Sequence, residues 1–127
     1  RFIMQQIHTE NAPKAIGPYS QAIKVGGLVF ASGQLPIDMT TGQFPEGIKE
    51  QTRASLTNAA AILKEAGSDL SRVVKTTVFL SDMDNFAAMN EVYAEFFQQP
   101  YPARSAVAVK TLPKNALVEI ECVATTE

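Results

Sequence analysis

Two segments with helical periodicity interrupt a chain that otherwise consists of short apolar strands. Over residues 48–66, apolar and small residues recur every three or four positions, and Gly67 follows as a stop signal. Helical spacing returns over residues 81–99, where Asp82 or Asp84 is expected to cap the helix. Strand-like segments precede, separate and follow the two helices. This order predicts one α+β domain, with both helices on one face of a mixed β-sheet.

Five segments have the β-branched and apolar composition of strands. They cover residues 21–25, 28–32, 72–80, 103–109 and 116–124. The first two flank Gly26-Gly27, which is typical of a β-hairpin. In the strand over 72–80, Val74 is expected to share a face with Thr76, and neither face is clearly polar. The sheet face without helices would therefore expose apolar side chains, which predicts an oligomer with clefts between its subunits.

Composition limits the possible classes of protein. A chain of 127 residues with 46% hydrophobic and 19% charged residues predicts a single globular domain over residues 1–127. Met4 resembles a natural start, so residues 1–3 are expected to be an addition to the natural chain. The net charge of -2, without a basic run, argues against nucleic-acid binding. The chain shows neither a membrane-spanning run nor a signal peptide.

The chain has one cysteine, Cys122, and one histidine, His8. A single cysteine forms no internal disulfide, which favours a reducing compartment, and we expect a cytoplasmic protein. Two such residues in separate segments cannot form a Cys/His zinc site. Cys122 also lies within an apolar strand, so a cysteine–histidine nucleophile pair is not expected.

Arg104 stands out because it follows a proline turn and begins a run of small apolar residues, in the segment YPARSAVAVK. Its guanidinium group is a planar fork of donors that matches a carboxylate. At the edge of a cleft it would anchor a small carboxylic acid. The residue alone favours the more common alternative, an edge-strand arginine paired with a surface glutamate.

Glu119 and Glu121 alternate with apolar residues in the last strand, so both point to the face opposite the core. A carboxylate at an interface needs a cationic partner, or its pKa should rise. Either arrangement can move protons near neutral pH. A structural ion pair is an equally good interpretation of these residues.

Four further residues are weaker candidates. Asn90 lies within an apolar helix stripe, where a loop could satisfy its amide, and Tyr19 follows a rigid Gly-Pro turn, where a packing role is more common. Ser32 and Gly33 end a strand, and a glycine there allows a ligand to approach the backbone, although a tight turn is the simpler explanation.

Taken together, these motifs resemble a known family. The chain resembles the reactive intermediate deaminase family (Rid, formerly YjgF) in six segments that occur in the family's order and spacing from about His8 to Thr125: AIGPYSQA, FASGQLP, VVKTTVFLSDM, NEVYAEFF, PARSAVAV and LPKNALVEIECVA. The resemblance implies a chorismate-mutase-like α+β fold, in a homotrimer whose sheets form a central β-barrel with ligand sites in the clefts between subunits.

The resemblance also implies an activity that needs no cofactor or metal. Rid proteins hydrolyse reactive enamines and imines, above all 2-aminoacrylate through 2-iminopropionate, to pyruvate and ammonia, and so protect pyridoxal-phosphate enzymes. By the same resemblance Arg104 would bind the substrate carboxylate, with help from the Gly33 backbone, and Glu119 would position or activate water. The other pocket residues would be Tyr19, Ser32 and Asn90.

One departure from the family concerns Ala106, because many members have Arg-Ser-Cys where this chain has Arg-Ser-Ala. A thiol role at this position is therefore in doubt, although hydrolysis of an imine does not need one. Two other functions stay open: a non-catalytic module that binds 2-keto acids as a sensor, and RNA cleavage, which the acidic balance of the chain disfavours.

Overall fold

A computed structural model of the chain describes residues 3–127. Residues 1 and 2, which belong to the segment expected to precede the natural start, lie outside the described residues. Its helices and strands are β1 Gln5–Ile7, β2 Ala22–Val25, β3 Leu28–Gln34, α1 Gly47–Glu65, β4 Val73–Leu80, α2 Phe86–Phe96, β5 Ala103–Ala108 and β6 Val118–Thr125. Three short 3₁₀ turns precede β4, α2 and β6, at Leu70–Arg72, Met83–Asn85 and Pro113–Asn115.

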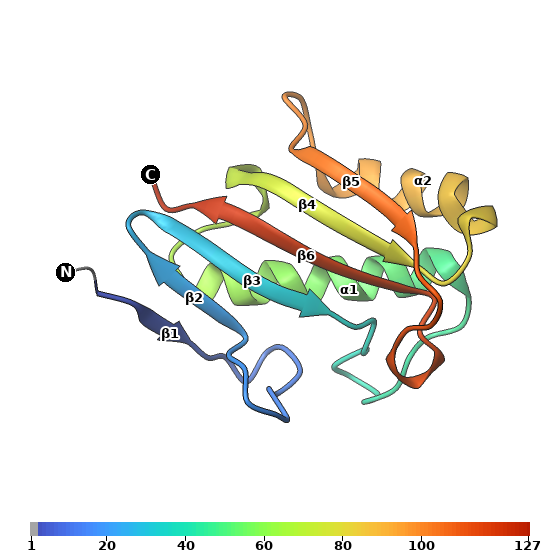
Figure 1. The fold of residues 1–127 in the computed structure, drawn as a ribbon, viewed down its shortest axis with the longest axis horizontal. Helices are drawn as coiled ribbons and strands as arrows, with labels where there is room; N and C mark the ends of the chain where they lie inside the picture. Colours follow the sequence, from blue (N-terminus) through green and yellow to red (C-terminus); the bar gives the residue numbers. More distant parts are fainter. Residues whose placement is uncertain (1–2) are drawn as a thin grey trace.

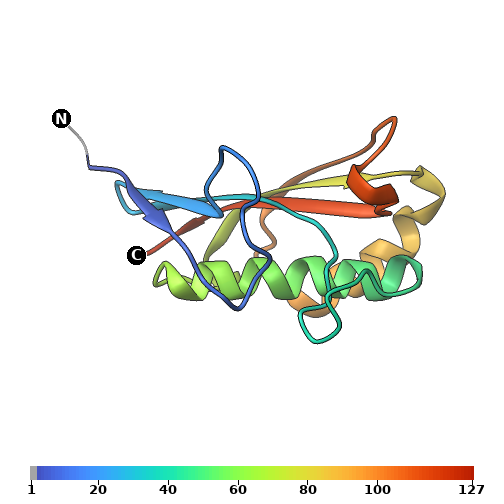
Figure 2. The same cartoon turned by 90° about the horizontal axis from the view of Figure 1, so that it is seen from below.

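The strands form one six-stranded sheet in the order β1-β2-β3-β6-β4-β5 (Figure 1). Only β4 and β5 pair in parallel, because α2 connects them as a crossover, and the other neighbours are antiparallel. Both helices lie on the same side of the sheet (Figure 2). The predicted α+β domain with a mixed sheet and two helices on one face is confirmed. The homotrimer and its central barrel concern an assembly of three chains and stay predictions.

The core lies between the sheet and the helices. Val29, Val78 and Ile120 point from neighbouring strands toward Ile62 and Leu63 of α1, and all five are at most 1% exposed. Burying side chains of this size contributes roughly 1.5–3 kcal/mol each, which is what fixes the helices on this face.

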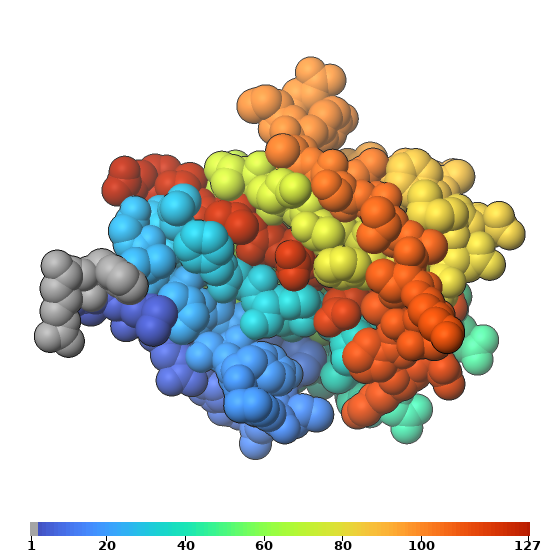
Figure 3. All heavy atoms as spheres, in the orientation of Figure 1, coloured from blue at the N-terminus to red at the C-terminus, as the bar shows by residue number. Residues whose placement is uncertain are grey.

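The opposite face of the sheet is open in the single chain (Figure 3). Phe30 on β3 is 45% exposed and Val107 on β5 is 46% exposed. Phe30 alternates with the buried residues Val29 and Ala31 of β3, and Val107 alternates with the half-buried residues Arg104 and Ala106 of β5. A second protein surface would be needed to remove this apolar area from water.

Three local features differ from the sequence-based expectation. The strand β1 was missed, because two of its three residues are glutamines and its pairing with β2 is a tertiary contact. Val74 does not share the buried face of Thr76, because a register shift between Val73 and Lys75 turns its side chain outward to 47% exposure. Asp82 accepts a hydrogen bond from a backbone N–H in the 3₁₀ turn before α2, so it caps that turn rather than the helix itself.

Candidate functional site

Arg104 lies on the helix-covered face of β5. It is the register partner of Thr76 on β4, and Thr76 is fully buried beneath α2. The Nη1 atom of Arg104 donates a hydrogen bond of 2.7 Å to Oδ1 of Asn90. Its guanidinium carbon lies 4.7 Å from the ring centroid of Tyr93 and 5.5 Å from that of Phe86. Amide and aromatic groups, rather than a carboxylate, therefore hold this cation.

The alternative in which Arg104 pairs with a surface glutamate is wrong for the single chain. Within residues 3–127, the ion pairs are made by other cations: His8, Lys49, Arg53 and Arg72. A guanidinium group has five N–H donors, and the Asn90 contact uses one of them. Arg104 can therefore still bind a carboxylate in a bidentate manner.

A cavity of about 480 Å³ opens beside this guanidinium. Its lining residues come from α2 and from the start of β5: Asn90, Tyr93, Ala94, Tyr101, Pro102 and Arg104. The proline turn noted in the sequence thus forms one wall of the cavity. Asn90, a weak candidate by sequence, is directly joined to the strongest one.

Glu119 lies on the open face of β6, between the buried residues Val118 and Ile120. Its pKa is raised from its ordinary value, mainly because partial burial disfavours the charged carboxylate and also because Glu121 is nearby on the same face. A carboxyl group with a raised pKa exchanges protons more readily near neutral pH. The sequence left open whether Glu119 forms an ion pair or has a raised pKa, and the structure has the second arrangement.

Gly33 lies against the Glu119 carboxyl group. A Cβ atom added at Gly33 would be 2.6 Å from Oε2 of Glu119, and Cβ atoms in proteins essentially never approach another heavy atom this closely. The absence of a side chain at Gly33 is therefore what gives the carboxyl group its position. The register of β3 against β6 shifts between Ala31 and Gln34, and this irregularity displaces Gly33 from the regular ladder.

Ser32 and Tyr19 line a second cavity together with Glu119. The Ser32 hydroxyl donates to the carbonyl of Ser20 at 2.7 Å, and the Ser32 N–H donates to the carbonyl of Gln21 at 2.9 Å. These bonds fix the segment that carries Tyr19. The Tyr19 ring is 50% exposed, so it is not a packing residue of the single chain.

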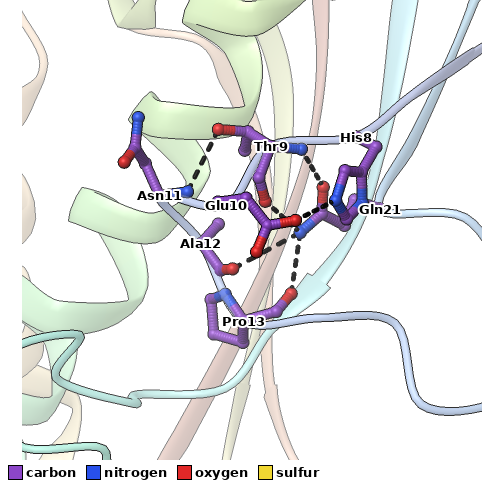
Figure 4. A network of polar contacts seen from close by, with 7 residues as sticks. All are labelled: His8, Thr9, Glu10, Asn11, Ala12, Pro13 and Gln21. Atoms are coloured by element: carbon purple, nitrogen blue, oxygen red, sulfur yellow. Dashed lines mark hydrogen bonds and ion pairs between the residues drawn. The ribbon is translucent and has the colours of Figure 1, made fainter.

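Gln21 is a structural residue of this site that the sequence interpretation missed (Figure 4). Its side chain is buried, accepts a hydrogen bond of 2.7 Å from the N–H of Thr9, and donates to the carbonyls of Thr9, Ala12 and Pro13. The available signal was a glutamine directly before the first residue of β2, Ala22. These bonds hold the loop that forms one wall of the cavity around Glu119.

This second cavity has a volume of about 720 Å³. Its lining residues come from the N-terminal loop, the β3 end and the turn before β6: Pro13, Lys14, Ile16, Tyr19, Gln21, Ser32, Gly33, Gln34, Leu35, Ile37, Met39, Gly42, Pro113, Lys114 and Glu119. The wall is mostly apolar, with Glu119 as its only carboxyl group and lysines as its cations.

The six predicted site residues therefore form two groups. Arg104 and Asn90 lie on the helix side of the sheet, whereas Glu119 and Gly33 lie on the open side with Tyr19 and Ser32. The strand register gives the same result, because Arg104 pairs with buried Thr76, while Glu119 pairs with Phe79, which points the other way. The two cavities share no lining residue.

Other kinds of site find no support in the part of the chain that the structure describes. No group of three or more His, Cys, Asp or Glu side chains there could hold a metal ion. The helices within residues 3–127 are too short or too polar to cross a membrane. Burial raises the pKa of the Cys122 thiol to about 12, so this thiol is not a nucleophile at neutral pH.

Comparison with known proteins gives matches over nearly the whole chain. The family model described as Endoribonuclease L-PSP matches residues 9–126. Reactive Intermediate Deaminase A, chloroplastic, of Arabidopsis thaliana is 52% identical over 120 residues, which are 94% of this chain and 64% of that protein. The 2-iminobutanoate/2-iminopropanoate deaminase of Capra hircus is 50% identical over 124 residues, which are 97% of this chain and 90% of the relative.

Solved structures give the same match. The crystal structure of TdcF from E. coli with bound serine superimposes with a TM-score of 0.91 at 42% identity, and the match covers 97% of this chain and 99% of the TdcF chain.

Proposed function

The chain belongs to the Endoribonuclease L-PSP family, within which it is a reactive intermediate deaminase (Rid) protein, and from this membership we propose that it hydrolyses small 2-imino acids to 2-keto acids and ammonia. The preferred reaction is that of 2-iminopropionate, formed from 2-aminoacrylate, to pyruvate. The physiological role would be to protect pyridoxal-phosphate enzymes from the reactive enamine. Two deaminase-named relatives with at least 50% identity support this reaction.

The observation that carries the proposal is the Arg104 guanidinium, which is oriented by Asn90 and lies beside an open cavity without a carboxylate partner among the described residues. The carboxylate of a 2-imino acid matches its remaining donors as a bidentate pair. Serine, the molecule bound to TdcF, also has a carboxylate next to a nitrogen-bearing carbon.

Hydrolysis then needs a placed water molecule and proton transfer. A water oxygen forms a bond to C2 of the protonated imine, the C=N bond becomes a single bond, and ammonia leaves as the C2–O bond becomes a carbonyl. Glu119 has the properties to accept a proton from the water and return it to the leaving nitrogen, because its pKa lies above the ordinary glutamate value. The protein residues alone would supply these steps, since an imine already reacts with water.

The two groups of site residues would meet in an oligomer. We propose a homotrimer in which Arg104 and Asn90 of one subunit face Tyr19, Ser32, Gly33 and Glu119 of its neighbour. The exposed apolar side chains on the open sheet face, including Phe30 and Val107, would be covered in the same assembly. Light scattering during size-exclusion chromatography would measure three chains per particle, and a monomer would refute this arrangement.

The activity is tested with a lyase that generates 2-aminoacrylate from an amino acid. The expected result is faster pyruvate release, and longer survival of the pyridoxal-phosphate enzyme, when the protein is added. Arg104→Ala should abolish both effects. If Arg104→Ala retains full activity, the guanidinium is not the carboxylate anchor.

A mixing experiment tests the shared site. Arg104→Ala and Glu119→Ala chains should each have strongly reduced activity alone, but co-refolded mixtures should regain activity, because a mixed interface can combine the intact Arg104 of one chain with the intact Glu119 of the other. If the mixture stays as inactive as the single variants, Arg104 and Glu119 belong to a site within one subunit.

The wild-type protein and Arg104→Ala also distinguish the two alternative functions, a 2-keto acid sensor and an RNA-cleaving enzyme. A non-catalytic sensor would bind pyruvate or 2-ketobutyrate without accelerating imine hydrolysis. The family description includes the word endoribonuclease, so RNA cleavage should be measured as well. Nuclease activity that survives both repurification and Arg104→Ala would indicate a different site.

A further inference from the structure

The guanidinium group of Arg104 stacks on the ring of Tyr93, and the Tyr93 hydroxyl is in turn hydrogen-bonded to the strand beneath it. Tyr93 lies one helical turn after Asn90 on α2, and its ring centroid is 4.7 Å from the Arg104 guanidinium carbon. Its hydroxyl shares a hydrogen bond of 2.7 Å with the Thr76 hydroxyl. Tyr93 is 6% exposed and Thr76 fully buried, so this arrangement belongs to the protein interior.

Thr76 is the polar member of an otherwise apolar row. The other side chains of β4 on the buried face are Val73, Val78 and Leu80, and Thr76 is also the register partner of Arg104 on β5. Its hydroxyl would lose its hydrogen bond without the Tyr93 phenol, and a buried polar group without a partner is unfavourable. Thr76 on β4 thus holds the Tyr93 phenol oxygen next to Arg104, its neighbour on β5.

The Tyr93 ring also contacts a second aromatic ring. Phe97 packs on Tyr93 with ring centroids 4.6 Å apart. The Tyr93 phenol stays neutral at working pH, because burial raises its pKa above the ordinary value of 10. Arg104 therefore faces an uncharged, immobile ring, and Asn90 fixes its rotation by one hydrogen bond at Nη1.

From these contacts we propose that Tyr93, anchored by Thr76, is a positioning residue that fixes the plane of the Arg104 guanidinium for its carboxylate ligand. Asn90 constrains one edge of the fork, and Tyr93 constrains its tilt. The ligand part of this proposal rests on the proposed function, but the immobilisation of Arg104 does not. Pre-organisation of a binding group improves affinity because less motion is lost when the ligand arrives.

The first test measures Arg104 itself in the ligand-free protein. In the wild type, the ¹⁵Nε relaxation of Arg104 should give an order parameter near that of rigid backbone, about 0.85, and in Tyr93→Leu it should fall below about 0.6. Val92→Ala is the matched control, because it removes buried apolar volume from α2 at a side chain outside the Phe97–Tyr93–Arg104 stack. An equal fall in both variants, or no fall in Tyr93→Leu, would overturn the proposal.

The second test measures the apparent dissociation constant of pyruvate, used as the probe. Tyr93→Leu should raise it about tenfold, whereas Val92→Ala should change it less than about threefold, although Val92→Ala also removes buried apolar volume from α2. In the imine assay, KM should rise in Tyr93→Leu while kcat falls much less. If Arg104→Ala binds pyruvate as the wild type does, the proposed function fails, and the relaxation data still decide whether Tyr93 holds Arg104.

Milder variants serve if Tyr93→Leu does not fold. Tyr93→Phe and Thr76→Val each remove the same hydrogen bond and keep the ring, so each should weaken pyruvate binding about threefold. Because both break one bond, the double variant should be no weaker than either single one. Fully additive effects would show that Thr76 does not act through Tyr93.

Discussion

Replacing Gly33 with alanine should remove much of the activity and leave the fold intact. The added Cβ would lie 2.6 Å from Oε2, 2.9 Å from Cδ and 3.1 Å from Cγ of Glu119. The carboxyl oxygen must move by about 0.8 Å to restore an ordinary van der Waals contact of 3.4 Å. A displacement of that size at a proton-transfer group can lower the rate by about 10- to 100-fold.

The effect on stability should be small for a separate reason. The backbone of Gly33 lies outside the left-handed region, so alanine fits its conformation and restricts the unfolded chain, a gain of roughly 0.4–1 kcal/mol. The clash is with the flexible end of a side chain, and moving Glu119 off its rotamer costs roughly 0.5–1.5 kcal/mol. The free energy of unfolding should therefore change by less than about 1 kcal/mol.

Urea unfolding and the coupled pyruvate assay measure the two effects on the same sample. Gly17→Ala is the matched control, because its Cβ would meet only the Tyr19 ring, at an ordinary 3.7 Å. If Gly33 acts through Glu119, the Gly33→Ala/Glu119→Ala double variant should be no slower than Glu119→Ala alone. A fully active Gly33→Ala variant, or additive losses in the double variant, would refute the reasoning.

Four further predictions follow from single side chains. Arg104→Lys keeps the charge but loses the planar fork, so KM for the imino acid should rise about tenfold or more in the coupled assay, and an unchanged KM would contradict a bidentate contact. The raised pKa of Glu119 means that its ionisation opposes folding: the folded chain is favoured below the ordinary glutamate pKa of 4.5, and this advantage is lost as pH rises through the raised folded-state pKa. Glu119→Gln should therefore raise Tm at pH 7 but not at pH 4, as calorimetry can show. Iodoacetamide should leave the activity intact because Cys122 is buried with a pKa of about 12, whereas an Ala106→Cys variant should show whether a thiol beside Arg104 introduces sensitivity. Lys114 has a φ of 56°, in the left-handed region, so Lys114→Gly should stabilise the chain by up to about 1 kcal/mol in thermal unfolding, and a lower Tm in the variant would contradict this reasoning.

Local sequence patterns were sufficient for the elements and the layer order. The three-to-four-residue spacing over 48–66 corresponds to α1, Gly47–Glu65, and Gly26-Gly27 connects β2 and β3 as a hairpin. The alternation around Glu119 placed its carboxyl group opposite the core. These features depend on residues close together in the chain, because side-chain direction repeats with the period of each element. The family motifs, which are also local, predicted the six candidate site residues.

Tertiary structure decided how those residues are grouped. Which face of β5 carries Arg104 depends on its register with β4, and a shift of one residue would turn its side chain to the other face. The same kind of shift turns Val74 outward and brings Gly33 against Glu119. The Thr76–Tyr93 hydrogen bond joins residues 17 apart in the chain, and the Gln21 bonds reach back 12 residues. Periodicity contains no information about such pairings, since they are selected by the packing of whole elements against one another.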